Sequence, residues 1–132
     1  MSDLIRKRLT GKEEGFTLIE LLVVIVILGI LMAIAVPSYL GFQSRAYDAA
    51  AKANVRAALP SVEAYYGDNS TYATMTAANL ALIDAGIKID PLVAADQTAT
   101  SFCISSTQGS THVFSQNGPA ASITAGKCPG AP

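Results

Sequence analysis

Gly-Phe-Thr-Leu-Ile-Glu, residues 15–20, opens an apolar run that is unbroken from Leu21 to Val36. Glu20 is the only charged residue between Phe16 and Ser44. An acidic residue at the centre of a membrane helix costs roughly 2.5–3.5 kcal/mol on insertion scales, and less near an interface. Charged side chains inside such segments usually pair with an opposite charge. We therefore expect a cation to meet the Glu20 carboxylate.

The apolar segment is long enough to cross a bilayer. Phe16 to Leu40 spans about 25 residues, or roughly 37 Å as a helix, against a hydrocarbon core of about 30 Å. The residues before it include four cations, namely Arg6, Lys7, Arg8 and Lys12. Such a basic stub predicts that the N-terminus stays in the cytoplasm while the rest of the chain crosses.

A conventional signal-peptide cleavage is the alternative, because Ala33 and Ala35 are spaced like an A-x-A site. Three features disfavour it: the run is long, it begins with an acid, and it leads into another helical pattern.

Composition places one small domain after this segment. The chain has 132 residues and a formal net charge of −1. No basic run follows residue 12, so we expect no nucleic-acid partner.

The two cysteines, Cys103 and Cys128, both fall on the expected exported side. An even count in an oxidising compartment predicts a disulfide, with two unpaired buried thiols as the alternative.

An amphipathic helical pattern follows the apolar run without a linker. Apolar residues recur at spacings of three and four, at Tyr47, Ala51, Val55, Ala58, Leu59, Val62 and Tyr66. We therefore predict one long helix over about Phe16–Tyr66, with an Asp48–Lys52 ion pair on its surface. Pro37 removes a helical hydrogen bond and predicts a kink. At Pro60 we expect a second kink rather than a stop, because the apolar face continues in register.

The rest of the chain predicts an α+β head. Thr76–Ala85 has the pattern of a short helix ended by Gly86, and Pro91–Gln97 that of a loop. Three short strands are then expected, at about Ala99–Ser106, Thr111–Gln116 and Ala120–Thr124. They predict a small antiparallel sheet of three to four strands packed against the long helix.

The sequence gives little support for catalysis, and we expect neither an enzyme nor a bound cofactor. His112 is the only histidine, and we expect a structural or surface role for it. With one histidine and two cysteines that are expected to be bonded, the usual zinc ligand sets cannot be assembled. Asp84, Asp90 and Asp96 are candidate calcium ligands, but their spacing fits no EF-hand loop, so we expect solvated acids.

The residues from Gly15 to Val24, Gly-Phe-Thr-Leu-Ile-Glu-Leu-Leu-Val-Val, resemble the class III signal of type IV pilins and the related pseudopilins. The resemblance continues through Pro37-Ser38-Tyr39, through the turn Asp68-Asn69-Ser70-Thr71-Tyr72 and through the late cysteine pair. It is strong over about residues 12–45 and loose afterwards. The chain is most similar to a major pilin of the type IVa kind.

This resemblance implies a processing step and a fold. A membrane peptidase would cut between Gly15 and Phe16, and the same enzyme would N-methylate Phe16. Residues 1–15 would be the leader, 16–44 the hydrophobic half of the helix, and 45–132 the globular head. The head would comprise the amphipathic half-helix 45–66, a loop and short helix over 67–97, and a sheet over 98–128. The implied fold is the type IV pilin fold.

The resemblance also implies partners and a location. Subunits would sit in the cytoplasmic membrane with the head outside, then leave the lipid to form a helical homopolymer at the cell surface. An inner-membrane assembly platform would be a further partner. Opening of the helix around Pro37 in assembled filaments is implied too.

Chemistry leads independently to the same role for Glu20. Cleavage before Phe16 creates an α-amino group that is cationic below a pKa of about 8. Methylation keeps that charge. The amine lies four residues before Glu20, so the pair can form within one chain or between neighbours. Our hypothesis is that Glu20 pairs with the Phe16 amine of an adjacent subunit, so that processing switches on assembly.

Three alternative functions remain open for this chain. A plain signal anchor would give Glu20 no role. A secretion pseudopilin would form a short periplasmic piston. A minor pilin would serve as an adhesin or a DNA-uptake receptor. No motif in the sequence indicates whether a pilus built from this chain would serve adhesion, twitching motility or DNA uptake.

Overall fold

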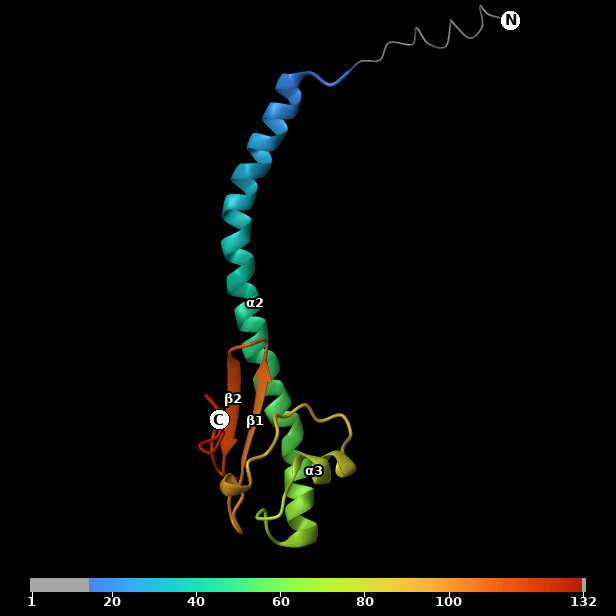
Figure 1. Ribbon diagram of the computed structural model, residues 1–132, viewed down its shortest axis with the longest axis vertical. Helices are drawn as coiled ribbons and strands as arrows, with labels where there is room; N and C mark the ends of the chain where they lie inside the picture. Colours follow the sequence, from blue (N-terminus) through green and yellow to red (C-terminus); the bar gives the residue numbers. More distant parts are fainter. Residues whose placement is uncertain (1–14, 132) are drawn as a thin grey trace, which may run out of the picture. The chain divides into compact units, whose positions relative to one another are not determined.

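The computed structural model describes residues 15–131; the basic stub and the rest of the expected leader before Gly15 lie outside the described residues. The elements in chain order are α2 (Leu18–Asn69), α3 (Ala77–Ile83), the 3-10 helix η1 (Ala94–Asp96), β1 (Cys103–Gln108), β2 (His112–Asn117) and β3 (Thr124–Ala125). Figure 1 labels α2, α3, β1 and β2. The chain divides into two compact units, Met1–Leu40 and Gly41–Pro132, called unit 1 and unit 2 below. The architecture is α+β, as predicted.

Unit 1 contains the first part of α2, and its apolar side chains are exposed all round the helix. Phe16 is 93% exposed and Leu18 82%, and even Leu22 remains 45% exposed. The most apolar 18-residue window of α2 has a mean hydropathy of 3.1, and none of it is buried. By length and composition α2 can therefore cross a membrane, a property that it shares with signal sequences.

The long helix continues through both prolines. A single helix from Leu18 to Asn69 includes Pro37 and Pro60, so the expectation that Pro60 does not stop the helix is confirmed. Next to Pro37, the Ser38 hydroxyl donates to the Ile34 carbonyl at 3.1 Å. Such back-bonding by serine often bends a helix. The kink at Pro37 itself stays a prediction.

One face of α2 in unit 2 is buried and forms one side of the hydrophobic core. The buried residues on this face are Ala51, Val55, Ala58, Ser61, Val62 and Tyr65. The predicted apolar face is thus largely confirmed, although Tyr65 takes the buried position expected for Tyr66. Leu80, Phe102 and Ile104 cover this face and are fully buried. The small residues at 51, 58 and 61 let the covering strand and loop approach the helix closely.

A buried tyrosine closes the far end of the core. Tyr72 stacks on Tyr66 at 4.5 Å between ring centroids and meets the Phe102 ring edge-on at 4.9 Å. Burial raises the pKa of the Tyr72 hydroxyl, and the nearby Glu63 carboxylate adds to the rise. The hydroxyl donates to Glu63 Oε1 at a long 3.5 Å.

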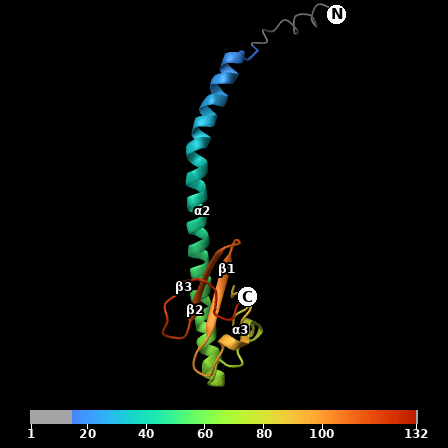
Figure 2. The ribbon, with the colours of Figure 1, turned by 60° about the vertical axis from the view of Figure 1, so that its left-hand side comes forward.

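The sheet is antiparallel, with strand order β1-β2-β3. Figure 2 shows its strands beside the part of α2 that belongs to unit 2. The register pairs Cys103 with Asn117 and Gln108 with His112. Gly109 begins the turn between β1 and β2 at φ +60, a conformation that glycine adopts without strain.

The predicted strand starts were wrong at both ends of the sheet. Strand β1 begins at Cys103 rather than Ala99, because Thr98 and Ser101 close a local turn: the Thr98 amide donates to the Ser101 carbonyl at 2.8 Å. Strand β3 is confined to Thr124–Ala125, because the chain first turns after Gly118, whose carbonyl accepts from the Ala121 amide at 3.3 Å.

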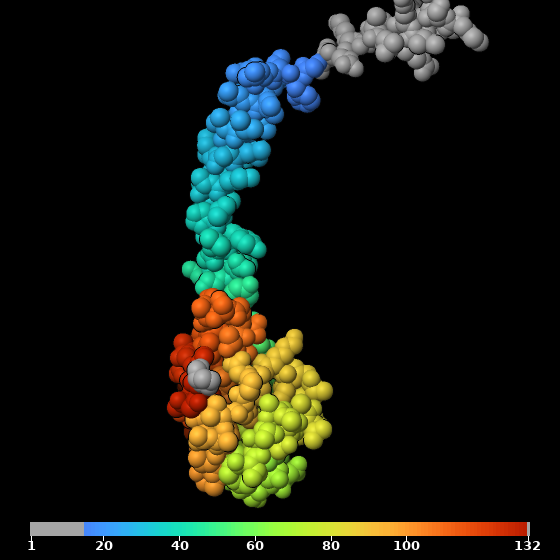
Figure 3. Space-filling model, in the orientation of Figure 1, coloured from blue at the N-terminus to red at the C-terminus, as the bar shows by residue number. Residues whose placement is uncertain are grey.

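The segment between α2 and β1 packs on the flank of unit 2, where Figure 3 shows it in yellow-green to yellow. Helix α3 begins after Thr76, whose hydroxyl accepts from the Asn79 amide at 3.2 Å. It ends at Ile83, two residues before the predicted end, because Asp84 turns the chain by accepting from the Gly86 amide at 2.8 Å. The expected loop Pro91–Gln97 contains η1.

Two links hold the C-terminal segment. Cys103 and Cys128 form a disulfide with Cα atoms 5.8 Å apart and a sequence separation of 25, as the even cysteine count predicted. The Gly130 amide donates to both carboxylate oxygens of Asp96 at 3.0 Å. The disulfide therefore ties the first residue of β1 to a segment with little regular structure of its own.

Replacing both cysteines by alanine should lower the free energy of unfolding of unit 2 by about 3.5 kcal/mol, because the cross-link closes a loop of 25 residues. The measurement is denaturant unfolding of the full chain in detergent, followed by near-UV circular dichroism of the buried tyrosines. Reducing the wild type with a thiol is the matched control and should give the same loss. An unchanged midpoint in both would contradict the prediction.

Candidate functional site

The start of α2 is closed by a reciprocal pair of side chains, Thr17 and Glu20. Thr17 Oγ1 accepts from the Glu20 amide at 3.3 Å. In return, Glu20 Oε2 accepts from the Thr17 amide and from the Thr17 hydroxyl, both at 2.8 Å. This arrangement is a capping box, in which two backbone donors that the helix cannot satisfy find side-chain acceptors.

Sequence reasoning missed the capping box although its signal was present. Thr-Leu-Ile-Glu, residues 17–20, fits the pattern of Ser or Thr followed three residues later by an acid, directly before an apolar run. The prediction from the sequence treats Glu20 only as a charge. Its carboxylate also sets where the helix begins, at Leu18 rather than the predicted Phe16.

The predicted cleavage residues lie just outside the helix. Gly15 and Phe16 precede α2 without regular structure, and both are exposed. Together with Thr17 and Glu20 they line a shallow hollow. The sequence therefore brings the bond between Gly15 and Phe16 to an accessible position beside the one acid of the apolar segment.

Only one of the two carboxylate oxygens of Glu20 is used by the cap. Oε2 receives both bonds from Thr17, while Oε1 receives none from the described residues. Within residues 15–131 the structure records no cation paired with Glu20. The positive partner that we expected is therefore not supplied by this part of the uncleaved chain.

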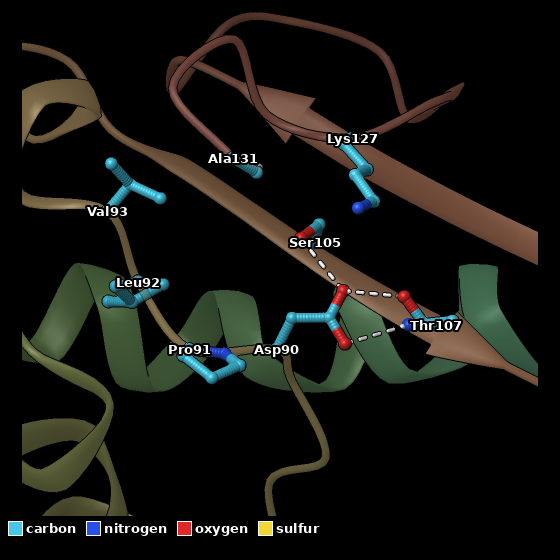
Figure 4. Close-up of a pocket in the computed structure, with 8 residues that line it drawn as sticks. All are labelled: Asp90, Pro91, Leu92, Val93, Ser105, Thr107, Lys127 and Ala131. Atoms are coloured by element: carbon cyan, nitrogen blue, oxygen red, sulfur yellow. Dashed lines mark hydrogen bonds between the residues drawn. The ribbon is translucent and has the colours of Figure 1, made fainter.

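The three acids weighed as calcium ligands do not come together. Asp84 accepts from the Gly86 amide of its own turn, and Asp96 accepts from the Gly130 amide of the C-terminal segment. Figure 4 shows the Asp90 carboxylate held by Ser105 and Thr107 of β1. Asp90 Oδ2 accepts from both hydroxyls at 2.9 Å, and Oδ1 accepts from the Thr107 amide at 3.1 Å. Asp90 thus fastens its loop to the sheet.

Within the described part of the chain, no group of three or more histidine, cysteine or acidic side chains is placed to hold a metal ion. His112 binds Asp48 instead, with 2.7 Å between Nδ1 and Oδ1, and this pair links β2 to α2. The predicted Asp48–Lys52 pair is therefore wrong. Lys52 lies over the ring of Phe114, 4.6 Å from its centroid.

Thr17→Val should loosen the first turn of α2, because valine removes the hydroxyl that the capping box needs. Loss of a cap costs about 1 kcal/mol, so hydrogen exchange of the amides of residues 18–21 should be roughly five-fold faster. The measurement uses the full chain in detergent micelles. Thr17→Ser keeps the hydroxyl and is the matched control. Equal exchange rates in all three proteins would show that the cap contributes nothing.

Comparison with known proteins places this N-terminal region in a family. The prokaryotic N-terminal methylation motif matches residues 11–36. The type IV major pilin protein of Myxococcus xanthus is 38% identical over 65 residues, which are 49% of this chain and 30% of that protein. The type IV wide pilus major component of Thermus thermophilus is 42% identical over 78 residues, 59% of this chain and 57% of that protein.

A secretion protein is similarly close. The type II secretion system core protein G of Escherichia coli is 36% identical over 78 residues, 59% of this chain and 54% of that protein. The matches thus extend over 30 to 57% of the length of these relatives. The methylation motif, the exposed apolar helix and the small antiparallel sheet agree with one another: the chain carries the prokaryotic N-terminal methylation motif and is similar to type IV major pilins and to core protein G of type II secretion systems.

Proposed function

We propose that the chain is a structural subunit of a type IV pilus. It is cleaved after Gly15, N-methylated at Phe16 and polymerised through the apolar part of α2. The observation that carries this proposal is the apolar surface of unit 1, which is exposed all round and carries one capped carboxylate at its start. Exposed apolar surface of this extent marks a membrane or protein contact. The membrane covers this apolar surface before assembly, and the packed helices of a filament core cover it afterwards.

The two carboxylate oxygens of Glu20 have different roles, one in capping the helix and the other in assembly. Oε2 stays on Thr17 and fixes the helix start, while Oε1 is free to accept from a cation. Cleavage before Phe16 supplies that cation as a new α-amino group, and methylation preserves its charge. In a core without water an unpaired carboxylate is costly, so the paired arrangement selects one axial register between neighbours.

Before assembly, the subunit lies in the membrane, because the apolar surface of unit 1 needs lipid around it. The N-terminus is then in the cytoplasm and residues 45–132 are outside. Residues 1–15 serve as the leader, and the peptidase that removes them and the inner-membrane assembly platform are the partners. Afterwards the subunit belongs to a filament at the cell surface.

A secretion pseudopilin is the second candidate, because core protein G of type II secretion systems recurs among the relatives, also in Vibrio cholerae and Pseudomonas aeruginosa. Two features of unit 2 support the pilus over it. The C-terminal segment is fastened by a disulfide. In addition, Asp84, Asp90 and Asp96 are each occupied by separate hydrogen bonds rather than gathered for a calcium ion.

Material sheared from cells tests the proposal directly. The wild-type chain should dominate the sheared filaments, and its mass should correspond to a chain that starts at Phe16 and carries one added methyl group. A pseudopilin or a minor pilin would be scarce in the same fraction. Filaments that contain the chain from Met1, or sheared material without the chain, would overturn the proposal.

Glu20→Gln separates the charge from the cap. Glutamine can still accept from the Thr17 amide in a capping box, but it offers no negative charge to the amine. Sheared filament yield should therefore fall at least roughly ten-fold, since breaking a buried ion pair costs about 3–5 kcal/mol. Processing and membrane insertion should be unchanged, as judged by the mass of the subunit in the membrane fraction.

Glu20→Ala and Thr17→Val complete this comparison. Alanine removes both the cap and the charge, and should lose filaments at least as fully as glutamine. Thr17→Val weakens the cap but keeps the carboxylate, so filaments should persist. If Glu20→Gln polymerises like the wild type, then the charge of Glu20 has no part in assembly.

A further inference from the structure

The outer edge of β1 is the kind of place at which a further strand adds to a sheet. Within residues 15–131 the strand order is β1-β2-β3, so β1 pairs with a strand on one side only. In an antiparallel pair, the amides and carbonyls of alternate residues point toward the partner strand. Those of Cys103, Ser105 and Thr107 point away from β2, since their hydrogen bonds run to the segment that precedes the strand.

The sheet brings no charge of its own to this edge. Residues 97–126 contain no aspartate, glutamate, lysine or arginine. Strand β1 itself, Cys-Ile-Ser-Ser-Thr-Gln, also contains no proline. Charged side chains and prolines are common means by which edge strands avoid pairing with other chains. Any protection of β1 therefore has to come from outside the strand.

Asp90 supplies such protection through its backbone and its side chain together. Its amide donates to the Ser105 carbonyl at 2.8 Å. Its carboxylate lies along the strand (Figure 4), where Oδ1 accepts from the Thr107 amide at 3.1 Å. Oδ2 accepts from the hydroxyls of Ser105 and Thr107, both at 2.9 Å. One residue thus occupies the positions that the backbone of an added strand would take.

Two further bonds complete this cover. At the start of β1, Gln97 Nε2 donates to the Cys103 carbonyl at 2.8 Å. The Ser106 hydroxyl donates to the Lys88 carbonyl at 2.9 Å, which fastens the loop two residues before Asp90. The covered edge therefore begins at the first residue of the strand.

We propose that Asp90 is a lock on the edge of β1, which keeps the sheets of two copies of this chain from pairing. When the lock is removed, β1 of a second copy adds antiparallel to the bared edge and joins the two sheets into one. This inference concerns unit 2 and does not depend on the pilus proposal.

The second copy is the occupant that fits, because an antiparallel pair of β1 strands is complementary to itself. With Ser105 of the two copies opposite each other, Cys103 of each copy lies opposite Thr107 of the other. All three are then hydrogen-bonded pairs, in which each outward amide meets an outward carbonyl. A two-fold axis relates the copies, as in most dimers of identical chains. The uncharged strand sets no like charges against each other.

Asp90→Ala in the full chain tests the lock. In detergent micelles, which cover the apolar part of α2, the fraction of associated chain should rise at least roughly ten-fold above that of the wild type. A hydrogen bond to a charged group shifts an equilibrium by about this factor. Analytical ultracentrifugation measures the association, and the amide I infrared band reports strand pairing between chains. The matched control is Asp84→Ala, since Asp84 accepts the Gly86 amide of its own turn rather than a group of β1.

Two further variants show whether the association uses the edge of β1. Asp90→Asn keeps a side chain that can accept from the Thr107 amide and donate to the hydroxyls, so it should behave like the wild type. Added to Asp90→Ala, Thr107→Lys places a charge on the bared edge and should suppress the association. Thiol alkylation reports whether each variant forms its disulfide. If Asp90→Ala does not, the double variant Ser105→Ala with Thr107→Val decides, because it removes both hydroxyl donors and should also associate.

The outcomes either support the lock or overturn it. Association on removal of the lock, with suppression by Thr107→Lys, supports it. Wild-type behaviour of the unlocked chain, equal association of Asp84→Ala or of Asp90→Asn, or association that persists with Thr107→Lys would each overturn it. None of these results bears on whether the wild type forms filaments, so the pilus proposal stands or falls separately.

Discussion

A carboxylate at the beginning of an exposed apolar helix is the constraint on which this molecule depends. Under the proposed function, Glu20 must be tolerated beside lipid and must still be available to a cation. The capping box meets the first demand, because two donors from Thr17 satisfy one oxygen of the carboxylate. Its second oxygen accepts no hydrogen bond from the described residues, and under the proposed function it accepts from the amine that cleavage creates. The same side chain therefore defines the start of the helix and, under the proposed function, also takes part in assembly.

The same helix serves a different purpose in unit 2. There only one face is covered, and it uses small residues such as Ala51 and Ala58 so that Phe102 and Ile104 can pack against it. Asp90 fastens the preceding loop to β1, and the disulfide fastens the segment that follows β3. These links let a short sheet cover the helix from one side. The opposite face keeps its charges in solvent.

The sequence predicted the features that depend on strong local patterns. The unbroken apolar run and the spacings of three and four determined the long helix, its passage through Pro60 and most of its buried face. The cysteine count predicted the disulfide. What failed depends on contacts that a pattern does not contain. Asp48 binds His112, which lies 64 residues away, rather than the nearby Lys52, and β1 starts late because Thr98 and Ser101 form a turn first.

The capping box is a different kind of failure, since the signal was local and was read only as a charge. The distinction matters for how an acid at the start of such an apolar helix is understood. If Glu20 were only an unpaired charge, its cost would be paid from synthesis onwards, and selection would favour its removal. The cap satisfies one oxygen of the carboxylate and two backbone donors at the start of the helix, so the acid already has hydrogen-bond partners in the uncleaved chain. Under the proposed function, cleavage would change only the partner of the second oxygen, and assembly would depend on a charge that the capping box already holds in place.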